Sequence, residues 1–378
     1  MGFLKNLFGG KSKVPKTDLT KRFELISRIG QGSMSRFFKA RDTKTGRIVG
    51  LKILDKEKTK KFEARFPPEL KKPVEGEVAV ALDHPNIVRT LEWGESLEGE
   101  PFLVMEFLEG VALSYLIDVQ NAVMQRNRLS FIIQLGEGLS YLHKQNWIHR
   151  DLCPRNVVVT EPELVVKLID FGLVVPNTPP FQAPGNRTGT ANYMAPELVR
   201  RQKTNHRIDI YSYAVTCFEM YTRRHPWPEA TSVDAVIQHI NQPPIPITQL
   251  LPDLDSQIAD TIMKGLEQDP AKRWQRAEQM VEQFREAEAR LPKPNLNEPP
   301  QATQAPSSQS ASPAGRPSPT GGGTTEGSGT AGRKAGGRPM RPPATGGKQP
   351  GNIRRPKPGD SAQDDDFIMD ILSNDGDS

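Results

Sequence analysis

The sequence predicts an α+β fold in which a small antiparallel sheet precedes a larger, mainly helical part and a disordered tail. Three observations predict this order. Alternating and β-branched residues come first, apolar residues at helical spacing follow, and a region rich in Pro, Gly, Ser and Thr begins after Leu291. We expect a basic and apolar extension over residues 1–22, one domain over residues 23–291, and the tail over residues 292–378.

The strands of the small sheet are predicted by four stretches rich in alternating apolar residues, namely "RFELISRIG" (residues 22–30), "SRFFKA" (35–40), "RIVGLKIL" (47–54) and "PFLVMEFL" (101–108). Helical spacing then begins in "NRLSFIIQLGEGLSYLHKQN" (127–146), where leucines and isoleucines share one face. Three later stretches continue the helical part: "DIYSYAVTCFEMYT" (209–222), "VDAVIQHI" (233–240) and "LDSQIADTIMKGLEQ" (254–268).

Bulk composition narrows the class of protein. The chain is 36% hydrophobic and 25% charged, which is typical of globular proteins. Its two cysteines, Cys153 and Cys217, cannot form a disulfide framework and indicate a reducing compartment. No apolar stretch reaches the roughly 18 residues of a membrane-spanning helix, and the N-terminus lacks a secretory signal, so we expect a cytoplasmic protein.

Both ends of the chain carry segments suited to weak contacts. "MGFLKNLFGGKSK" mixes Phe and Leu with Lys, a composition that favours weak contact with an anionic membrane surface. The acidic end "DDDFIMDILSND" either solubilises the tail or folds as a docking peptide on a partner protein. The net charge of +5 is modest and the basic residues are not gathered on a nucleic-acid module, so no nucleic-acid partner is expected.

Several separated motifs carry residues suited to phosphoryl transfer, which requires positioning and charge neutralisation more than covalent help. In "IGQGSMSRFFKA", Gly30 and Gly32 would let backbone amides approach phosphate oxygens, although an ordinary hairpin turn is the alternative. The expected nucleotide-binding residues of this loop are Ile29, Gly30, Gln31, Gly32, Ser33, Met34, Ser35, Arg36 and Phe37.

Lys52 follows on the next strand among apolar neighbours. An enclosed ammonium requires a carboxylate partner, for which Glu75 is the first candidate and Glu77 the second. A solvated strand lysine is the alternative interpretation.

The stretch "HRDLCPRNVVV" (149–159) places a carboxylate and an amide a short loop apart. Asp151 is suited to accept or orient the proton of an incoming hydroxyl, and the Asn156 side-chain oxygen is a ligand that Mg²⁺ prefers. Asp170 in "KLIDFGL" is placed to bridge Mg²⁺ to phosphates. We expect His149 to pack beneath the site.

Together with "GTANYMAPE" (189–197) and "DPAKRW" (269–274), these motifs resemble the eukaryotic-type (Hanks-type) serine/threonine protein kinases, over roughly Phe23 to Leu291. The likeness is greatest to bacterial members. The resemblance implies a two-lobed kinase fold that binds ATP and Mg²⁺ in the cleft and phosphorylates protein substrates. It implies a Lys52–Glu75 pair, Asp151 as the base contacted by Thr190, and Asn156 and Asp170 as metal ligands.

The same resemblance assigns supporting residues. Met105 corresponds to the gatekeeper, Glu106 and Leu108 to the hinge contacts with adenine, and Asp209 to the buried support of the catalytic loop. Glu197 and Arg273 correspond to the buried ion pair of the helical lobe. Arg150 beside Asp151 implies regulation by phosphorylation of the activation loop, with Thr188 and Thr178 as candidate acceptors and activation by phosphate on Thr188 as our hypothesis.

Departures from the family pattern concern nucleotide binding and the helix of Glu75. Ser35 and Phe37 replace the usual third glycine and valine of the loop, and we expect modestly altered nucleotide affinity. Pro73 fits only the first turn of that helix and Gly76 disfavours its interior by about 1 kcal/mol, so we expect a mobile helix.

A third departure is Cys153, which replaces a lysine that steadies the γ-phosphate, and the loss of one such charge is expected to slow the reaction about 10- to 100-fold. Arg155 either compensates in part or points to solvent. A thiol exposed in an electropositive cleft would also be oxidisable.

Two other functions remain open on the sequence. A pseudokinase would use this fold as a binding module with the tail as its interaction arm. A small-molecule phosphotransferase would share the Asp and Asn chemistry but would leave "GTANYMAPE" and "DPAKRW" without a purpose.

Overall fold

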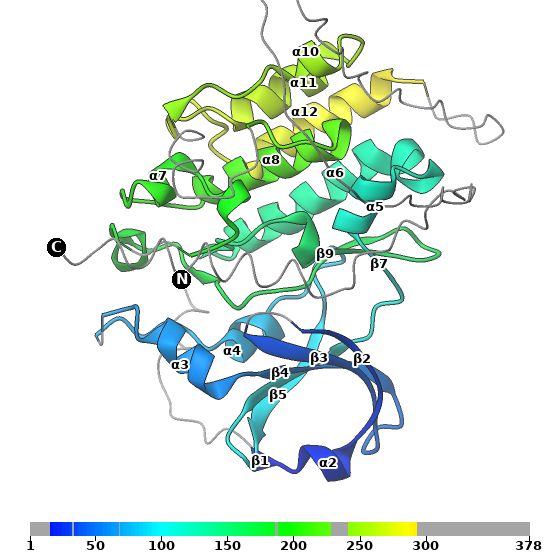
Figure 1. Cartoon of the computed structure of the whole chain (residues 1–378), viewed down its shortest axis with the longest axis vertical. Helices are drawn as coiled ribbons and strands as arrows, with labels where there is room; N and C mark the ends of the chain where they lie inside the picture. The colour runs from blue at the N-terminus through cyan, green and yellow to red at the C-terminus, as the bar shows by residue number, and fades with distance from the viewer. Residues whose placement is uncertain (1–15, 32–33, 68, 186–187, 228–240, 293–378) are drawn as a thin grey trace, which may run out of the picture. The chain divides into compact units, whose positions relative to one another are not determined.

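The computed structural model describes residues 16–31, 34–67, 69–185, 188–227 and 241–292. The expected helix over residues 233–240, the first residues of the chain and the tail lie outside this part. The described residues form a small lobe built on a sheet and a larger helical lobe (Figure 1). The predicted two-lobed α+β fold is therefore confirmed.

The small lobe contains a six-stranded sheet in the order β1-β5-β6-β4-β3-β2. All neighbours are antiparallel except β1 and β5. The strands are β1 (Lys16–Thr17), β2 (Phe23–Gln31), β3 (Ser35–Asp42), β4 (Ile48–Leu54), β5 (Thr90–Ser96) and β6 (Pro101–Glu106).

The described part of the small lobe also includes residues before Phe23. Residues Lys16–Thr17 form the edge strand β1, which pairs with Glu95 and Ser96 of β5, and the short helix α2 (Leu19–Arg22) follows. The Arg22 guanidinium contacts the carboxylates of Asp42 and Glu92 at 3.2 and 2.7 Å. These pairings place residues 16–22 in the small lobe, a result that a weak strand signal of two residues does not predict.

Two helices accompany the sheet, α3 (Lys56–Glu63) and α4 (Glu75–Val80). A Cβ atom on Gly76 would lie 2.5 Å from the Trp93 side chain of β5, so the glycine allows α4 to approach the sheet. Val78 and Ala79 of the same helix are also buried. Packing therefore offsets the low helix propensity of Gly76, and the mobility expected from propensity alone is not supported by this close contact.

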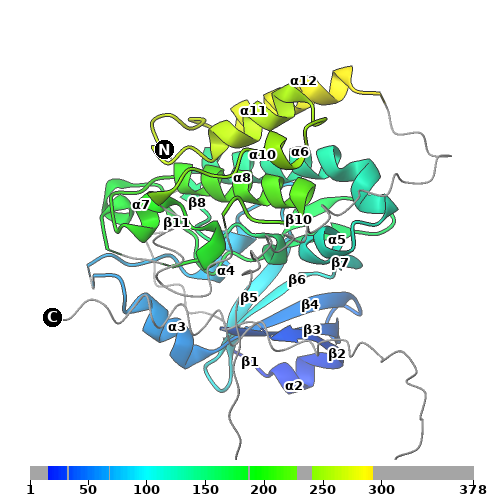
Figure 2. The same cartoon turned by 45° about the horizontal axis from the view of Figure 1, so that its top comes forward.

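The large lobe is mainly helical, and α6 is the longest of its described helices. α11 and α12 lie at the end of this lobe farthest from the small lobe in both views (Figures 1 and 2). The helices are α5 (Leu113–Val119), α6 (Ala122–Lys144), α7 (Pro196–Val199), α8 (Arg207–Thr222), α10 (Ile247–Leu250), α11 (Ser256–Gly265) and α12 (Ala277–Arg290).

Short strands and single helical turns at the lobe boundary carry the functional motifs. One sheet has the order β10-β9-β7 and another the order β11-β8. Their bounds are β7 (Gly110–Ala112), β8 (Trp147–Ile148), β9 (Val157–Thr160), β10 (Val166–Leu168) and β11 (Val175–Pro176), and the turns are η1 (Pro154–Asn156), η2 (Pro179–Gln182) and η3 (Ala191–Tyr193).

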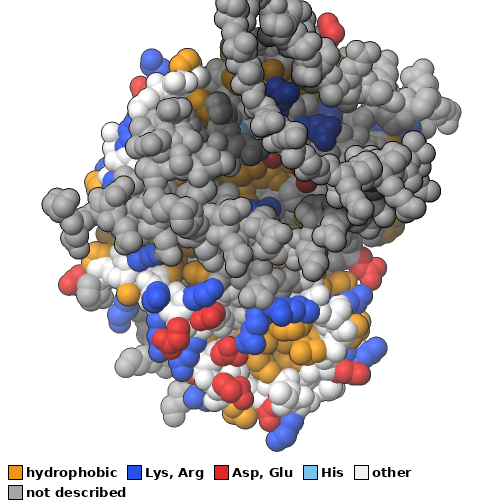
Figure 3. All heavy atoms as spheres, viewed as in Figure 1, with side chains coloured by type: hydrophobic (Ala, Val, Ile, Leu, Met, Phe, Trp, Pro, Cys, Tyr) orange, Lys and Arg blue, Asp and Glu red, His pale blue; other side chains and the backbone are white. Residues whose placement is uncertain are grey.

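The helices, the charged side chains and the cysteines of the described residues are all arranged as in globular proteins. No helix in the described ranges is long and apolar enough to cross a membrane. On the face shown in Figure 3, basic and acidic side chains of the small lobe are interspersed. Both cysteines, Cys153 and Cys217, are buried.

Candidate active site

Lys52 of β4 joins the two lobes through its ammonium group. Its Nζ atom lies 2.6 Å from Glu75 Oε1 at the start of α4 and 2.8 Å from Asp170 Oδ1 in the large lobe. The lysine is 6% exposed. The structure thus pairs Lys52 with Glu75, the first of the two candidates from the sequence.

Charge pairing sets the protonation of these groups. Burial alone would lower the pKa of Lys52, but the carboxylates of Asp170 and Glu75 raise it above its usual value. Burial would raise the pKa of Asp170, but the Lys52 ammonium and the N–H of Gly172 lower it below its usual range. Lys52 is therefore charged and Asp170 ionised at neutral pH.

Asp151 lies in the loop between β8 and η1, and its carboxylate is held from two sides. Thr190 donates to Asp151 Oδ1 through both its backbone N–H and its hydroxyl, each at 2.8 Å. Asn156 donates its amide to Asp151 Oδ2 at 3.0 Å and to the Asp151 carbonyl at 2.9 Å. These contacts fix the orientation of a half-buried carboxylate that is suited to receive a proton.

The loop of Asp151 rests on Asp209 of α8. The fully buried Asp209 carboxylate accepts the backbone N–H groups of His149 at 2.7 Å and Arg150 at 2.8 Å, and it contacts the His143 ring at 2.9 Å. His149 is 1% exposed and packs edge to face on Phe171, as expected for a residue beneath the site. Burial lowers the pKa of His149, so its ring is neutral at pH 7.

Two oxygen atoms remain available for a metal ion. The Asn156 amide nitrogen donates to Asp151 and Asp170 Oδ1 is occupied, whereas Asn156 Oδ1 and Asp170 Oδ2 accept no hydrogen bond from the described residues. The ranges that the structure describes contain no cluster of three acidic, His or Cys side chains suited to a metal. Mg²⁺ usually takes one or two carboxylates together with substrate phosphates and waters, so this donor set fits that ion.

The expected gatekeeper and the expected hinge contacts with adenine lie at the end of β6 and in the connection from β6 to β7. Met105 is buried at 2% exposure, Glu106 ends β6, and Leu108 is partly buried in the connection to β7. The Glu106 carboxylate accepts from Lys167 Nζ at 2.7 Å. Of the expected nucleotide loop, residues 29–31 end β2 and residues 35–37 begin β3, whereas Gly32 and Ser33 lie outside the described residues.

Gly50 was not predicted to contribute to the site. A Cβ atom on Gly50 would lie 2.8 Å from Phe37 Cζ and 3.5 Å from the Glu106 carbonyl. The Phe37 ring therefore occupies space that is available because residue 50 has no side chain. The sequence shows both residues, but only the pairing of β3 with β4 brings them together.

A Gly50→Ala variant is expected to weaken ATP binding, because the added methyl group displaces Phe37 toward the nucleotide cleft. In a Phe37→Val background the same change should be tolerated, which gives a coupling free energy of about 1–2 kcal/mol. Calorimetric titration of a non-hydrolysable ATP analogue into the four proteins of this cycle measures it. An equal loss in both backgrounds would contradict the interpretation.

Cys153 is not the exposed thiol that we considered. The residue is 1% exposed, and Thr190 Oγ1 lies 3.7 Å from its sulfur. Burial raises the pKa of the Cys153 thiol to about 12, and the Asp151 carboxylate adds to the rise. The expectation of an oxidisable thiolate is wrong, because this thiol is shielded and stays protonated.

The two candidate phosphoacceptors differ in accessibility. Thr188 is fully buried, and its hydroxyl has no hydrogen-bond partner among the described residues. Thr178 is half-buried immediately before η2. Arg150 is 7% exposed, and burial lowers its pKa to about 10. Phosphorylation of Thr188 would therefore require the segment between Asp170 and Glu197, which contains Thr188, to leave the observed conformation.

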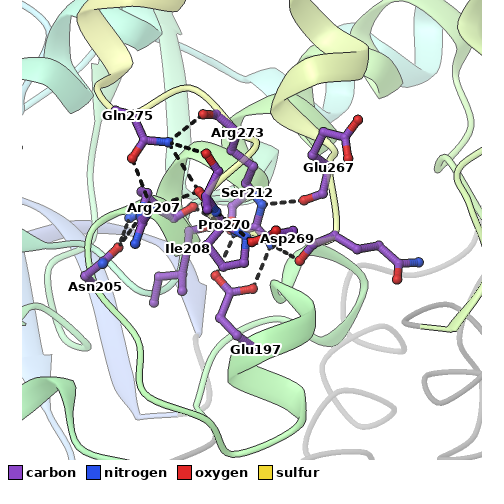
Figure 4. A network of polar contacts seen from close by, with 12 residues as sticks. Glu197, Asn205, Arg207, Ile208, Ser212, Glu267, Asp269, Pro270, Arg273 and Gln275 are labelled. Carbon is purple, nitrogen blue, oxygen red and sulfur yellow. Dashed lines mark hydrogen bonds and ion pairs between the residues drawn. The ribbon is translucent and has the colours of Figure 1, made fainter.

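A buried ion pair anchors the end of this segment to the large lobe (Figure 4). Arg273 makes two contacts of 2.7 Å with the Glu197 carboxylate and also donates to the carbonyls of Glu267, Gln268 and Arg207. Its guanidinium lies 4.8 Å from the centre of the Tyr211 ring. The pair expected from the sequence is thus present, with additional acceptors that satisfy the guanidinium.

Comparison with known proteins gives a consistent result. Residues 23–284 match the protein kinase domain family. The chain is 33% identical over 267 residues to a probable serine/threonine-protein kinase of Clostridium perfringens, covering 70% of this chain and 38% of that protein. It is 29% identical over 274 residues to the serine/threonine-protein kinase PknB of Mycolicibacterium smegmatis, covering 69% and 42%. It is 29% identical over 292 residues to PknB of Mycobacterium tuberculosis, covering 75% and 44%.

The chain spans about two fifths of the length of these curated relatives. The family match covers more than half of this chain and includes every described residue of the candidate site. This chain belongs to the protein kinase domain family.

Proposed function

We propose that this chain is a serine/threonine protein kinase that transfers the γ-phosphate of ATP to hydroxyl groups of proteins. The observation that carries the proposal is the convergence of two polar clusters. Lys52 bridges Glu75 and Asp170 at 2.6 and 2.8 Å, and Asp151 is bound to both Asn156 and Thr190. Phosphoryl transfer requires this combination of a cation, metal-binding oxygens and an oriented base.

Each residue has a separate task in the proposed reaction. ATP with Mg²⁺, when bound, supplies the phosphoryl group to be transferred. Lys52 neutralises phosphate charge and is held in place by Glu75. Asn156 and Asp170 would hold the metal through the oxygens that accept no hydrogen bond from the described residues. Asp151 orients the acceptor hydroxyl and accepts its proton, while Thr190 keeps the carboxylate in position.

Asp151 lines a small hollow together with polar and apolar side chains, among them Arg150, Thr190, Tyr193 and Ser212. The hollow is too small to hold a substrate side chain, so the proposed acceptor hydroxyl approaches the open side of the half-buried Asp151 carboxylate. A retained set of catalytic side chains in contact favours catalysis over a purely binding role.

Regulation by phosphate on the activation segment is part of the proposal. Arg150 lies next to Asp151 and is buried beneath this segment. Since Thr188 is enclosed, we propose that it becomes an acceptor only when the segment opens, and Thr178 is the more accessible candidate.

Labelled ATP with Mg²⁺ tests the proposed activity. The purified chain and an Asp151→Asn variant are incubated with a mixed protein substrate, and the labelled amino acids are identified after hydrolysis. Label on serine or threonine with the native chain alone supports the proposal. Nucleotide binding without label in either sample would favour the pseudokinase.

Cys153 and Arg155 give a second prediction about the same reaction. Cys153→Lys restores a cation beside the acceptor and is expected to raise kcat about tenfold, whereas Cys153→Ala should leave it nearly unchanged. The exposed Arg155 is near enough to Cys153 for its charge to act to lower the pKa of the thiol. If Arg155 compensates for the missing lysine, Arg155→Ala should reduce kcat. Steady-state rates with one peptide measure all three, and a rate unaffected by Arg155→Ala would exclude compensation.

A further inference from the structure

An aromatic contact connects the small lobe to the segment between Asp170 and Glu197, which we call the activation segment. Phe62 of α3 packs edge to face on Phe66 with ring centres 5.7 Å apart. Phe66 in turn meets Phe181 of η2 with ring centres 6.0 Å apart. Phe62 and Phe66 are only 5% and 8% exposed. None of these three residues belongs to the catalytic motifs.

Phe181 lies in a part of the activation segment that is bound to the large lobe. Its N–H donates to the Thr178 carbonyl at 3.0 Å. The next residue, Gln182, accepts the N–H of Thr204 at 3.0 Å through its carbonyl and donates its side-chain amide to Asn177 at 2.9 Å. These hydrogen bonds hold the backbone that carries Phe181.

Phe66 is joined by a short chain to the helix that carries Glu75. That connection contains prolines, including the buried Pro73, and ends at α4. Lys72, within it, places its ammonium 5.5 Å from the centre of the Phe62 ring. Burial lowers the pKa of Lys72 to about 8, although the Glu75 and Glu63 carboxylates act to raise it. The connection that leads to Glu75 is thus in contact with the aromatic cluster through Lys72.

The position of α4 depends on such outside contacts. The helix has six residues, includes Gly76, and has no side-chain cap at Val74. Helices of this length are unstable in isolation and are held by tertiary packing. Trp93 supports one side of α4. The chain that enters α4 is in contact with the aromatic cluster through Lys72, whose ammonium lies over the Phe62 ring.

We propose that Phe66 and Phe181 are positioning residues: their ring contact holds the activation segment and the N-terminal end of α4 together, and so keeps Glu75 paired with Lys52. This inference rests on the proposed kinase function. Through this contact the catalytic arrangement persists without a phosphate on the activation segment. A ring pair of this kind shifts the balance between assembled and open states by roughly three- to tenfold.

The experiment compares Phe66→Ala, Phe181→Ala and the double variant, all treated with phosphatase so that they share one phosphorylation state. Phe23→Ala is the matched control, because Phe23 is 3% exposed and packs edge to face on Phe102 in the separate core of the sheet. Hydrogen exchange is followed in residues 75–80 and 175–182, and kcat and KM for ATP are measured with a peptide. Phe66→Leu tests rescue by a side chain of similar volume.

We expect Phe66→Ala to speed exchange both in α4 and in the activation segment, and to lower kcat about three- to tenfold with a smaller change in KM. The double variant should be no slower than Phe66→Ala, because both single changes remove the same Phe66–Phe181 contact and Phe66→Ala also removes the contact with Phe62. Phe66→Leu should recover part of the loss. Phe23→Ala should destabilise the small lobe without faster exchange in residues 175–182.

Three results would overturn the inference: unchanged exchange of residues 75–80 in Phe66→Ala, equal exchange changes in Phe23→Ala, or additive losses of kcat in the double variant. The exchange measurements do not depend on catalysis. If the native chain transferred no phosphate, the proposed function would fail while the coupling between Phe66 and residues 175–182 could still be decided.

Discussion

An Asp151→Asn variant is expected to lose about 10²- to 10⁴-fold in kcat, the usual contribution of a positioned acid or base. Asparagine has nearly the same shape, but its amide group cannot accept the proton of the incoming hydroxyl. It also presents a donor where Asp151 now accepts two hydrogen bonds from Thr190 and one from Asn156. ATP affinity should change little, because Lys52, Glu75 and Asp170 remain paired.

Single-turnover phosphorylation of one peptide measures this loss, and titration with a fluorescent nucleotide measures ATP affinity. Asp253→Asn is the matched control, since Asp253 is exposed in the loop before α11. A kcat that stays within tenfold of the native value would remove Asp151 from the role of base, because that effect is smaller than a positioned base supplies.

An Arg273→Ala variant is expected to lower the free energy of unfolding by about 3–5 kcal/mol, because it leaves a buried carboxylate unpaired. Arg273 is 1% exposed and Glu197 is 4% exposed. Replacing both residues, as in Arg273→Met with Glu197→Leu, should cost less than the single change, since no buried charge remains. The carbonyl groups of Glu267, Gln268 and Arg207 also lose a donor when the guanidinium is removed.

Urea unfolding followed by circular dichroism gives these free energies. Arg285→Ala is the control, because Arg285 forms an exposed ion pair with Glu137 in the same lobe and such pairs contribute about 0–1 kcal/mol. If Arg273→Ala were no more destabilising than Arg285→Ala, the buried pair would not anchor this lobe as described.

Local sequence signals predicted four strands of the small lobe and the long helix α6. The stretches over residues 22–30, 35–40, 47–54 and 101–108 correspond to β2, β3, β4 and β6. The apolar face expected over residues 127–146 lies on α6, where Ile132, Ile133, Leu135, Leu139 and Leu142 are buried and Leu129 is partly buried. These signals succeed because periodic burial on one face is written directly in the order of residues.

Contacts between distant segments account for what the sequence did not predict. β1 is too short to carry a strand signal and exists through its pairing with β5. Gly76 disfavours a helix by propensity but lies against Trp93, and Gly50 accommodates Phe37. Propensity describes each residue alone, whereas these effects arise from atoms that meet only after folding.

The sequence by itself determined the kind of chemistry proposed for this protein, because Lys52, Asp151, Asn156 and Asp170 occur in motifs whose residue types suit phosphate, metal and hydroxyl groups. Tertiary structure decided which groups meet. It paired Lys52 with Glu75 in preference to Glu77, enclosed Cys153 and Thr188, and brought Phe66 to Phe181 across the lobes. Burial and distance control the pKa, the reactivity and the coupling of these groups. Both are set by how the side chains pack when the chain folds, and the order of residues does not show them directly.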